Sequence, residues 1–286
     1  MTCEPGESDG APRADAVAEP AIVVQEVSTR CVDGSPWRDA ALEDYIRRHR
    51  DGAVVAVNGP LTMPACVRCS LEVCPGIDAC VDPAVVWLRS TGREMVERAI
   101  ESDRDRIAVI PGGRGRGATA HRRGLSQSRV EPYVHRGCEL MLHYQRNSLH
   151  RDGMGRGTGP IAARGSHLRR RLARLGFQLN RDLLEVSARV TVTELYGERA
   201  ARGYRRDADP WRIRAGIVEG LAPLRFARGS RMAREEVLRN DNCFDALISG
   251  YTAFLWARDG WTLPSASAGP PVDDGWIWSP GDRRPE

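Results

Sequence analysis

The chain has 286 residues, of which 41% are hydrophobic, enough for one sizeable core. Its longest apolar runs, such as Ala53–Val57, have the length of a strand and fall far short of the roughly 20 residues needed to cross a bilayer. The N-terminal residues have neither a basic start nor an apolar stretch, which argues against a secretory signal. We therefore expect a cytoplasmic protein with no membrane-spanning segment.

All 42 basic residues are arginine, and the formal net charge is +4 at pH 7. A guanidinium group binds phosphate in a bidentate manner, so this composition suits a nucleic-acid partner. Coding bias in a GC-rich genome explains the same arginines without any function, and the abundance of Gly, Ala and Pro agrees with it. Because 38 acidic residues are interspersed, any nucleic-acid surface has to be local.

Apolar periodicity begins only after residue 20, which predicts a disordered tail over 1–20 and one domain over 21–280. A strand over 22–28, a helix over 41–49 and a strand over 53–57 follow one another. This order is typical of a βαβ unit.

The rest of the chain alternates helical and strand patterns. In the helical pattern before Leu175, Leu168 and Leu172 continue an apolar stripe that arginines flank. The glycine-rich segment 111–117 lacks the Gly-Lys-Ser/Thr ending of a phosphate loop, so we interpret it as a flexible loop. We expect helices at 93–101, 138–146, 161–175, 189–202, 210–221 and 241–257, strands at 106–110, 183–187 and 275–280, and a tail at 281–286. The pattern predicts an α/β fold.

Glu185 is the most anomalous acidic residue, because it lies inside an expected strand between Leu184 and Val186. Burying a carboxylate without a partner is costly. Glu185 is therefore either a metal-binding or general-base carboxylate at the carboxyl edge of a sheet, or half of an ion pair with an arginine.

Asp241 and Asp245 are four residues apart, so they share one face of the last expected helix and could converge on one divalent cation. An Asp at a helix N-terminus also caps free amide groups, which stabilises the helix by about 1 kcal/mol. We interpret Asp241 as such a cap. Asp245 lies beyond the cap and is the better candidate for a site.

Four cysteines occur within a short segment: Cys66, Cys69, Cys74 and Cys80. Four thiolates can bind a tetrahedral zinc ion, and the first pair has the usual Cys-x2-Cys spacing. The later spacing is irregular. The alternative is a loop at 66–80 that carries reduced thiols.

Taken together, these segments resemble a predicted RNase H-like nuclease family known as domain of unknown function 429. The resemblance covers about Ile22 to Pro280 and rests on the order of five short motifs. They are Val57-Asn58-Gly59-Pro60-Leu61, Leu168-Arg-Arg-Arg-Leu172, Glu185-Val-Ser-Ala188, Asp241-Asn-Cys-Phe-Asp245-Ala-Leu247 and Gly275-Trp-Ile-Trp-Ser-Pro280.

The resemblance implies an RNase H-like mixed sheet flanked by helices, and phosphodiester hydrolysis with Mg²⁺ or Mn²⁺ held by carboxylates. Glu185 and Asp245 would be the metal ligands, with Asp241 a third acidic group and Asn58 at the fourth catalytic position. Two departures predict impaired or absent activity. Asn58 replaces the family's Asp, and the family's first strand with its Gly-x-Asp motif has no counterpart in residues 1–20.

Three hypotheses follow from the sequence. The first is a metal-dependent RNase H-like nuclease that is active, impaired or inactive. The second is a module of the same fold that holds nucleic acid through its arginines without cutting it. The third is a structural protein organised around a zinc ion in the four-cysteine loop.

Overall fold

The structure is a computed structural model that describes residues 22–31, 33–98, 130–145, 158–221, 224–227, 231–265 and 269–282. The expected tail at 1–20, the strand at 106–110 and the glycine-rich loop at 111–117 lie outside these residues. The tail expected at 281–286 is described over its first two residues, which belong to a short 3-10 helix, Pro280–Asp282.

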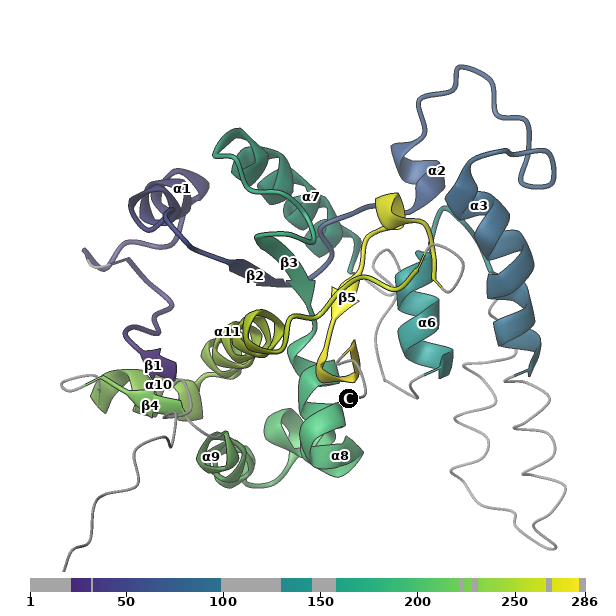
Figure 1. Ribbon diagram of the computed structural model, residues 1–286. Coiled ribbons are helices and arrows are strands. Elements are labelled where there is room, and N and C mark those ends of the chain that lie inside the picture. The colour runs from purple at the N-terminus through teal and green to yellow at the C-terminus, as the bar shows by residue number, and fades with distance from the viewer. Residues whose placement is uncertain are drawn as a thin grey trace, which may run out of the picture.

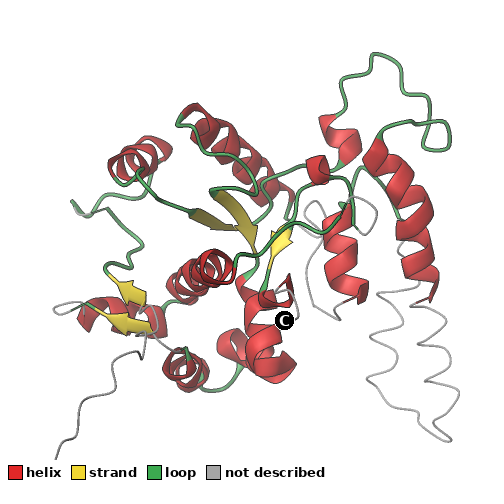
Figure 2. Ribbon diagram, in the orientation of Figure 1, coloured by secondary structure: helices red, strands yellow, loops and turns green. Residues whose placement is uncertain are grey.

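Short parallel strands surrounded by helices make up the described chain, which confirms the α/β class (Figures 1 and 2). The strands are β1 (Ile22–Val24), β2 (Val55–Asn58), β3 (Leu183–Val186), β4 (Leu224–Phe226) and β5 (Ile277–Trp278). The α-helices are α1 (Asp39–Arg48), α2 (Ala65–Arg68), α3 (Pro83–Trp87), α6 (Gly137–Gln145), α7 (Gly159–Arg174), α8 (Ala188–Arg206), α9 (Pro210–Gly220), α10 (Arg231–Arg239) and α11 (Asp241–Asp259). A π-helical turn, Leu88–Gly92, follows α3, and 3-10 helices span Val272–Asp274 and Pro280–Asp282. No helix within the described residues is long and apolar enough to cross a membrane.

The strands form two sheets, β1-β4 and β2-β3-β5, and every pairing between these named strands is parallel. The mixed sheet expected from the family resemblance is therefore absent from the described residues. The expected βαβ unit is also wrong, because β1 pairs with β4 and not with β2. Ile22 and Val24 lie opposite Leu224 and Phe226 in this pair of strands, and all four belong to the main hydrophobic core.

The larger sheet lies between two layers of helices (Figure 1). On one face, Leu183 packs with Leu172 of α7 and Ile46 of α1. On the other face, Leu184 and Val186 pack with residues of α8 and α11. All four residues of β3 are buried, so this strand is the centre of the sheet in packing as well as in order.

Side-chain caps begin several of the helices, α3 and α11 among them. Asn240 caps α11 by accepting hydrogen bonds from the amides of Asn242 and Cys243, and Gly260 ends it in the left-handed conformation. Asp82 caps α3 in the same way, with Pro83 at the first turn. The helix expected at 93–101 therefore begins ten residues earlier, at Pro83, and passes through the π-helical turn.

Candidate functional site

The polar residues at the carboxyl ends of β2 and β3 fall into two groups on opposite faces of the sheet. Val57 pairs with Glu185, and Asn58 pairs with Val186. Because successive side chains of a strand point to opposite faces, Glu185 lies on the face covered by α7, and Asn58 lies on the face covered by α11. Asp245 of α11 lies with Asn58. The structure therefore brings Asn58 and Asp245 together and separates both from Glu185.

Glu185 forms a buried ion pair with Arg136, whose side chain is fully enclosed. The two carboxylate oxygens of Glu185 accept hydrogen bonds from Nη2 and Nη1 of Arg136, at 2.6 and 2.9 Å. Oε2 also accepts one from the amide of Leu61, at 2.8 Å. The second interpretation of Glu185, an ion pair with an arginine, is thus the one that the structure confirms.

Arg136 uses every donor of its guanidinium group. Besides Glu185, it donates to Glu139 Oε1 from Nε and Nη2, at 3.0 and 2.7 Å, and to Thr62 Oγ1 from Nη1, at 2.7 Å. Glu139 also accepts from the amide of Arg136, as an acidic residue at the third position of a helix commonly does. Burial acts to lower the pKa of Arg136, but the neighbouring acidic groups Cys138, Glu139 and Glu185 outweigh it and raise that pKa well above its usual value.

A further buried carboxylate, Asp274, lies beside this network. Its Oδ2 accepts a hydrogen bond from the amide of Gly137 at the start of α6, and its backbone oxygen accepts one from Thr62 Oγ1 at 2.8 Å. Its Oδ1 accepts no hydrogen bond within the described chain and faces Nη2 of Arg68 at 3.7 Å. Burial raises the pKa of Asp274 to about 6, although Gly137 and the arginines act to lower it.

The raised pKa of Asp274 predicts a pH-dependent loss of stability. Because the pKa rises from 3.8 to about 6 on folding, the folded state binds more protons between these values. The free energy of unfolding should therefore fall as pH rises through this window, and Asp274→Asn should abolish that contribution. Relative to the variant, the wild type should lose on the order of 3 kcal/mol between pH 4 and 7.

Urea unfolding of both proteins at four pH values between 4 and 7 measures this difference. Asp44→Asn is the matched control, since Asp44 is exposed and forms an ion pair with the equally exposed Arg47 three residues away. A wild type and Asp274→Asn variant with parallel pH profiles would show that Asp274 keeps an ordinary pKa.

Asp245 is at the centre of the second group. Asn58 Nδ2 donates to its Oδ2 at 2.8 Å, Tyr204 Oη donates to its Oδ1 at 3.1 Å, and Arg205 forms an ion pair with Oδ2. The oxygen of Asn58 accepts from the amide of Ala188, which fixes the orientation of the Asn58 side chain. Burial raises the pKa of Asp245, although Arg205 and Tyr204 act to lower it, and burial with the charge of Asp245 raises the pKa of Tyr204 to about 12.

Asp241 is not the cap of α11, contrary to the sequence-based expectation. Asn240 is the cap, and Asp241 occupies the first helical position. Its Oδ2 lies 3.7 Å from Nε of Arg205. Arg205, with 43% of its side chain exposed, therefore joins Asp241 and Asp245. The spacing predicted convergence on a divalent cation, and in the structure the two aspartates converge on a guanidinium group.

The four cysteines lie around the end of α2. Cys69 and Cys74 are exposed, Cys66 is half-buried and Cys80 is buried, and all four are free thiols. Burial raises the pKa of Cys66, and the nearby Cys80, Cys74 and Cys69 raise it further. The alternative of reduced thiols in a loop describes this arrangement, and zinc binding stays a prediction.

Two arginines lie at the same edge of the sheet as Glu185: Arg169, from the Leu168–Leu172 motif, and Arg68, which the sequence did not single out. Arg68 ends α2, close after β2, and Arg169 lies on α7 one turn after Gly165, which touches the carbonyl of Pro60. Arg169 is half-buried and makes no hydrogen bond or ion pair with the described residues. Burial lowers the pKa of Arg169, and the charge of Arg68 lowers it further against the opposing effect of Asp273.

A metal site of the kind that the family resemblance implies does not fit these residues. The oxygens of Glu185 already accept three hydrogen bonds, and Asp245 binds Arg205 beside the uncharged Asn58. Across the described ranges, no three His, Cys, Asp or Glu side chains are grouped so that they could hold a metal ion. Comparison with protein-family models, with curated proteins and with solved structures gave no match to the chain.

Proposed function

We propose that the chain is a nucleic-acid-binding domain related to the RNase H-like nucleases, which holds the phosphate backbone without cutting it. The observation that carries the proposal is the half-buried Arg169 beside Arg68 at the carboxyl edge of the larger sheet. Ligands of open parallel sheets bind at this edge. The charge of Arg68 lowers the pKa of Arg169, and a phosphate bound by both guanidinium groups would offset that repulsion more directly than the nearby acidic groups Asp273 and Asp274 do.

The state of the carboxylates supports binding over hydrolysis. Hydrolysis with two metal ions needs carboxylates that are free to coordinate them. Here Arg136 holds Glu185, and Arg205 holds Asp245, so a guanidinium group stands at each position where the family resemblance implies a metal. Arginine contacts to phosphate need no metal and carry no sequence preference.

Fluorescence anisotropy with labelled single-stranded and duplex oligonucleotides, in the presence of a chelator, tests the proposal. We expect binding at about 50 mM salt that weakens steeply by about 200 mM, because bound phosphates release counterions. The double variant Arg68→Ala/Arg169→Ala should bind roughly tenfold more weakly and lower the salt slope by about two.

The matched control removes the same charge from exposed arginines, in the double variant Arg98→Ala/Arg170→Ala. Both residues lie on helix surfaces, and Arg170 is the neighbour of Arg169 on α7. Equal weakening by the two double variants would show that only net charge matters. Cleavage with Mg²⁺ or Mn²⁺ that Asp245→Asn abolishes would overturn the non-catalytic assignment, and no binding at low salt would overturn the proposal itself.

A further inference from the structure

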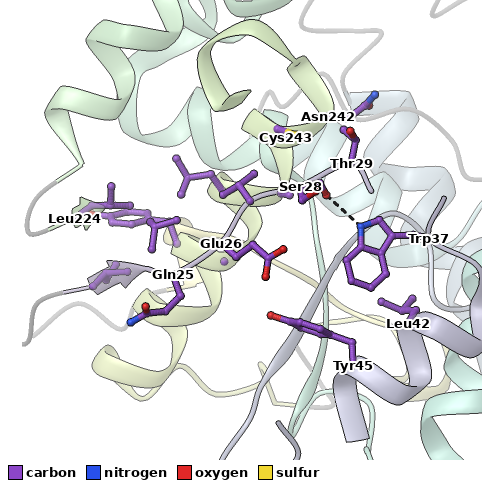
Figure 3. Close-up of a pocket in the computed structure, with 17 residues that line it drawn as sticks. Gln25, Glu26, Ser28, Thr29, Trp37, Leu42, Tyr45, Leu224, Asn242 and Cys243 are labelled. Atoms are coloured by element: carbon purple, nitrogen blue, oxygen red, sulfur yellow. Dashed lines mark hydrogen bonds between the residues drawn. The ribbon is translucent and has the colours of Figure 1, made fainter. Parts of the chain in front are cut away.

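A large open cavity lies between β1, α1 and the first half of α11 (Figure 3). It is separate from the carboxyl edge of the larger sheet that carries Arg68 and Arg169, called the arginine edge below. Its volume is about 740 Å³, within the usual range of sites for small molecules. The segment 25–29 after β1, the aromatic residues around α1 and one face of α11 border it. None of the residues of the arginine edge or of the Glu185 network contributes to it.

The floor of the cavity is a flat strip of α11. Asn242, Ala246 and Gly250 follow one another at intervals of four residues, so they lie along one face of the helix, and all three are exposed. A Cβ atom added at Gly250 would meet nothing within 4 Å. The small side chains of Ala246 and Gly250 therefore keep this face open.

Two aromatic rings form a wall, and neighbouring groups hold each of them in place. The indole Nε1 of Trp37 donates to the carbonyl of Ser28 at 3.3 Å, and the ring meets Tyr45 edge to face, with centroids 5.5 Å apart. His49 packs against the ring of Tyr45, with centroids 4.5 Å apart. Both rings are only half-buried, so aromatic surface is exposed beside the cavity before any ligand arrives.

The charged groups that line the cavity indicate which class of ligand it can bind. Glu26 is the one charged residue among the described residues that border the cavity, and Figure 3 shows its carboxylate directed toward the space beside Trp37 and Tyr45. No arginine within the described part of the chain borders it. Burial and Glu236 raise the pKa of the Cys243 thiol to about 11, so this thiol is neutral at pH 7. The lining is thus aromatic and negative, which disfavours anions.

We propose that this cavity binds a small organic cation, a protonated amine on an apolar body. The ammonium group would lie between the carboxylate of Glu26 and the rings of Trp37 and Tyr45, where ion pairing and cation–π attraction act together. The apolar body would lie over Ala246 and Gly250. Such a ligand complements both the negative charge of Glu26 and the aromatic surface of the lining.

Isothermal titration calorimetry with three probes of one shape tests the charge selection: 2-phenylethylamine, 2-phenylethanol and phenylacetate. At pH 7 the amine should bind roughly fivefold to thirtyfold more tightly than the alcohol, and phenylacetate should bind most weakly. Glu26→Gln should remove most of the difference between amine and alcohol. Glu94→Gln, on an exposed helix face, should leave it unchanged.

A second variant tests the location without touching charge. Gly250→Leu places a bulky side chain on the open floor and also favours the helix, so it should block all three probes in a folded protein. Equal binding of amine and phenylacetate, an amine preference that survives Glu26→Gln, or amine binding that survives Gly250→Leu would each overturn the proposal. So would the absence of heat with millimolar amine.

Discussion

Replacing Arg136 with Met should lower the free energy of unfolding by about 3–5 kcal/mol, the largest loss that we expect from any single arginine. The change leaves Glu185 and Glu139, which are 1% and 2% exposed, without the cation that both of them bind. Removing one partner of a buried ion pair costs this much because the remaining charge stays away from water. Chemical denaturation monitored by circular dichroism measures the loss.

The control is Arg98→Met, which breaks an ion pair of similar length, 2.8 Å, between side chains that are 76% and 60% exposed. That variant should lose less than about 1 kcal/mol. Neutralising the stranded carboxylates in Arg136→Met/Glu139→Gln/Glu185→Gln should restore more than half of the loss from Arg136→Met. If Arg136→Met were as mild as Arg98→Met, the buried network would not contribute to stability.

The elements with long apolar periodicity were predicted well from sequence. The last helix was expected over 241–257 and spans Asp241–Asp259, because its apolar stripe continues for more than four turns. Short elements were missed for the opposite reason. β4 has only three residues, and more than half of the residues of α10 are charged, so neither shows an apolar period.

The candidate site was predicted only in part, because the residue pattern of a strand shows which side chains share a face but not what packs against that face. Alternation in β3 shows that Glu185 faces away from Leu184, but not which helix covers that face. The partnership of Asn58 with Asp245 depends on how α11 packs against β2, which no local pattern specifies.

The identity of the cation was equally hidden in the sequence. The sequence allowed an ion pair between Glu185 and an arginine. It could not identify which of the 42 arginines is the partner, because Arg136 is 49 residues away in the chain. One local signal does exist. Arg136 and Glu139 stand three residues apart at the start of α6, a spacing at which an acidic side chain bonds back to the chain entering a helix.

The contact that sets α7 against the end of β2 should also be sensitive to substitution. A Cβ atom at Gly165 would lie 1.9 Å from the carbonyl oxygen of Pro60, which is backbone and cannot turn aside. Gly165→Ala should therefore push α7 from the sheet and lower the free energy of unfolding by about 1–3 kcal/mol or more. Leu61 follows Pro60, so the hydrogen bond from its backbone amide to Glu185 should weaken. The amide proton of Leu61 should then exchange with solvent faster.

Gly216→Ala separates this steric effect from the intrinsic cost of glycine in a helix. Gly216 is exposed within α9, with nothing within 4 Å of an added Cβ, so the variant should gain about 0.5–1 kcal/mol. Opposite signs for the two changes mean that α7 needs glycine for close approach, which in turn places Arg169 beside Arg68. A gain in both variants would mean that Pro60 does not lie against α7, and the arginine edge of the sheet would lose its structural basis.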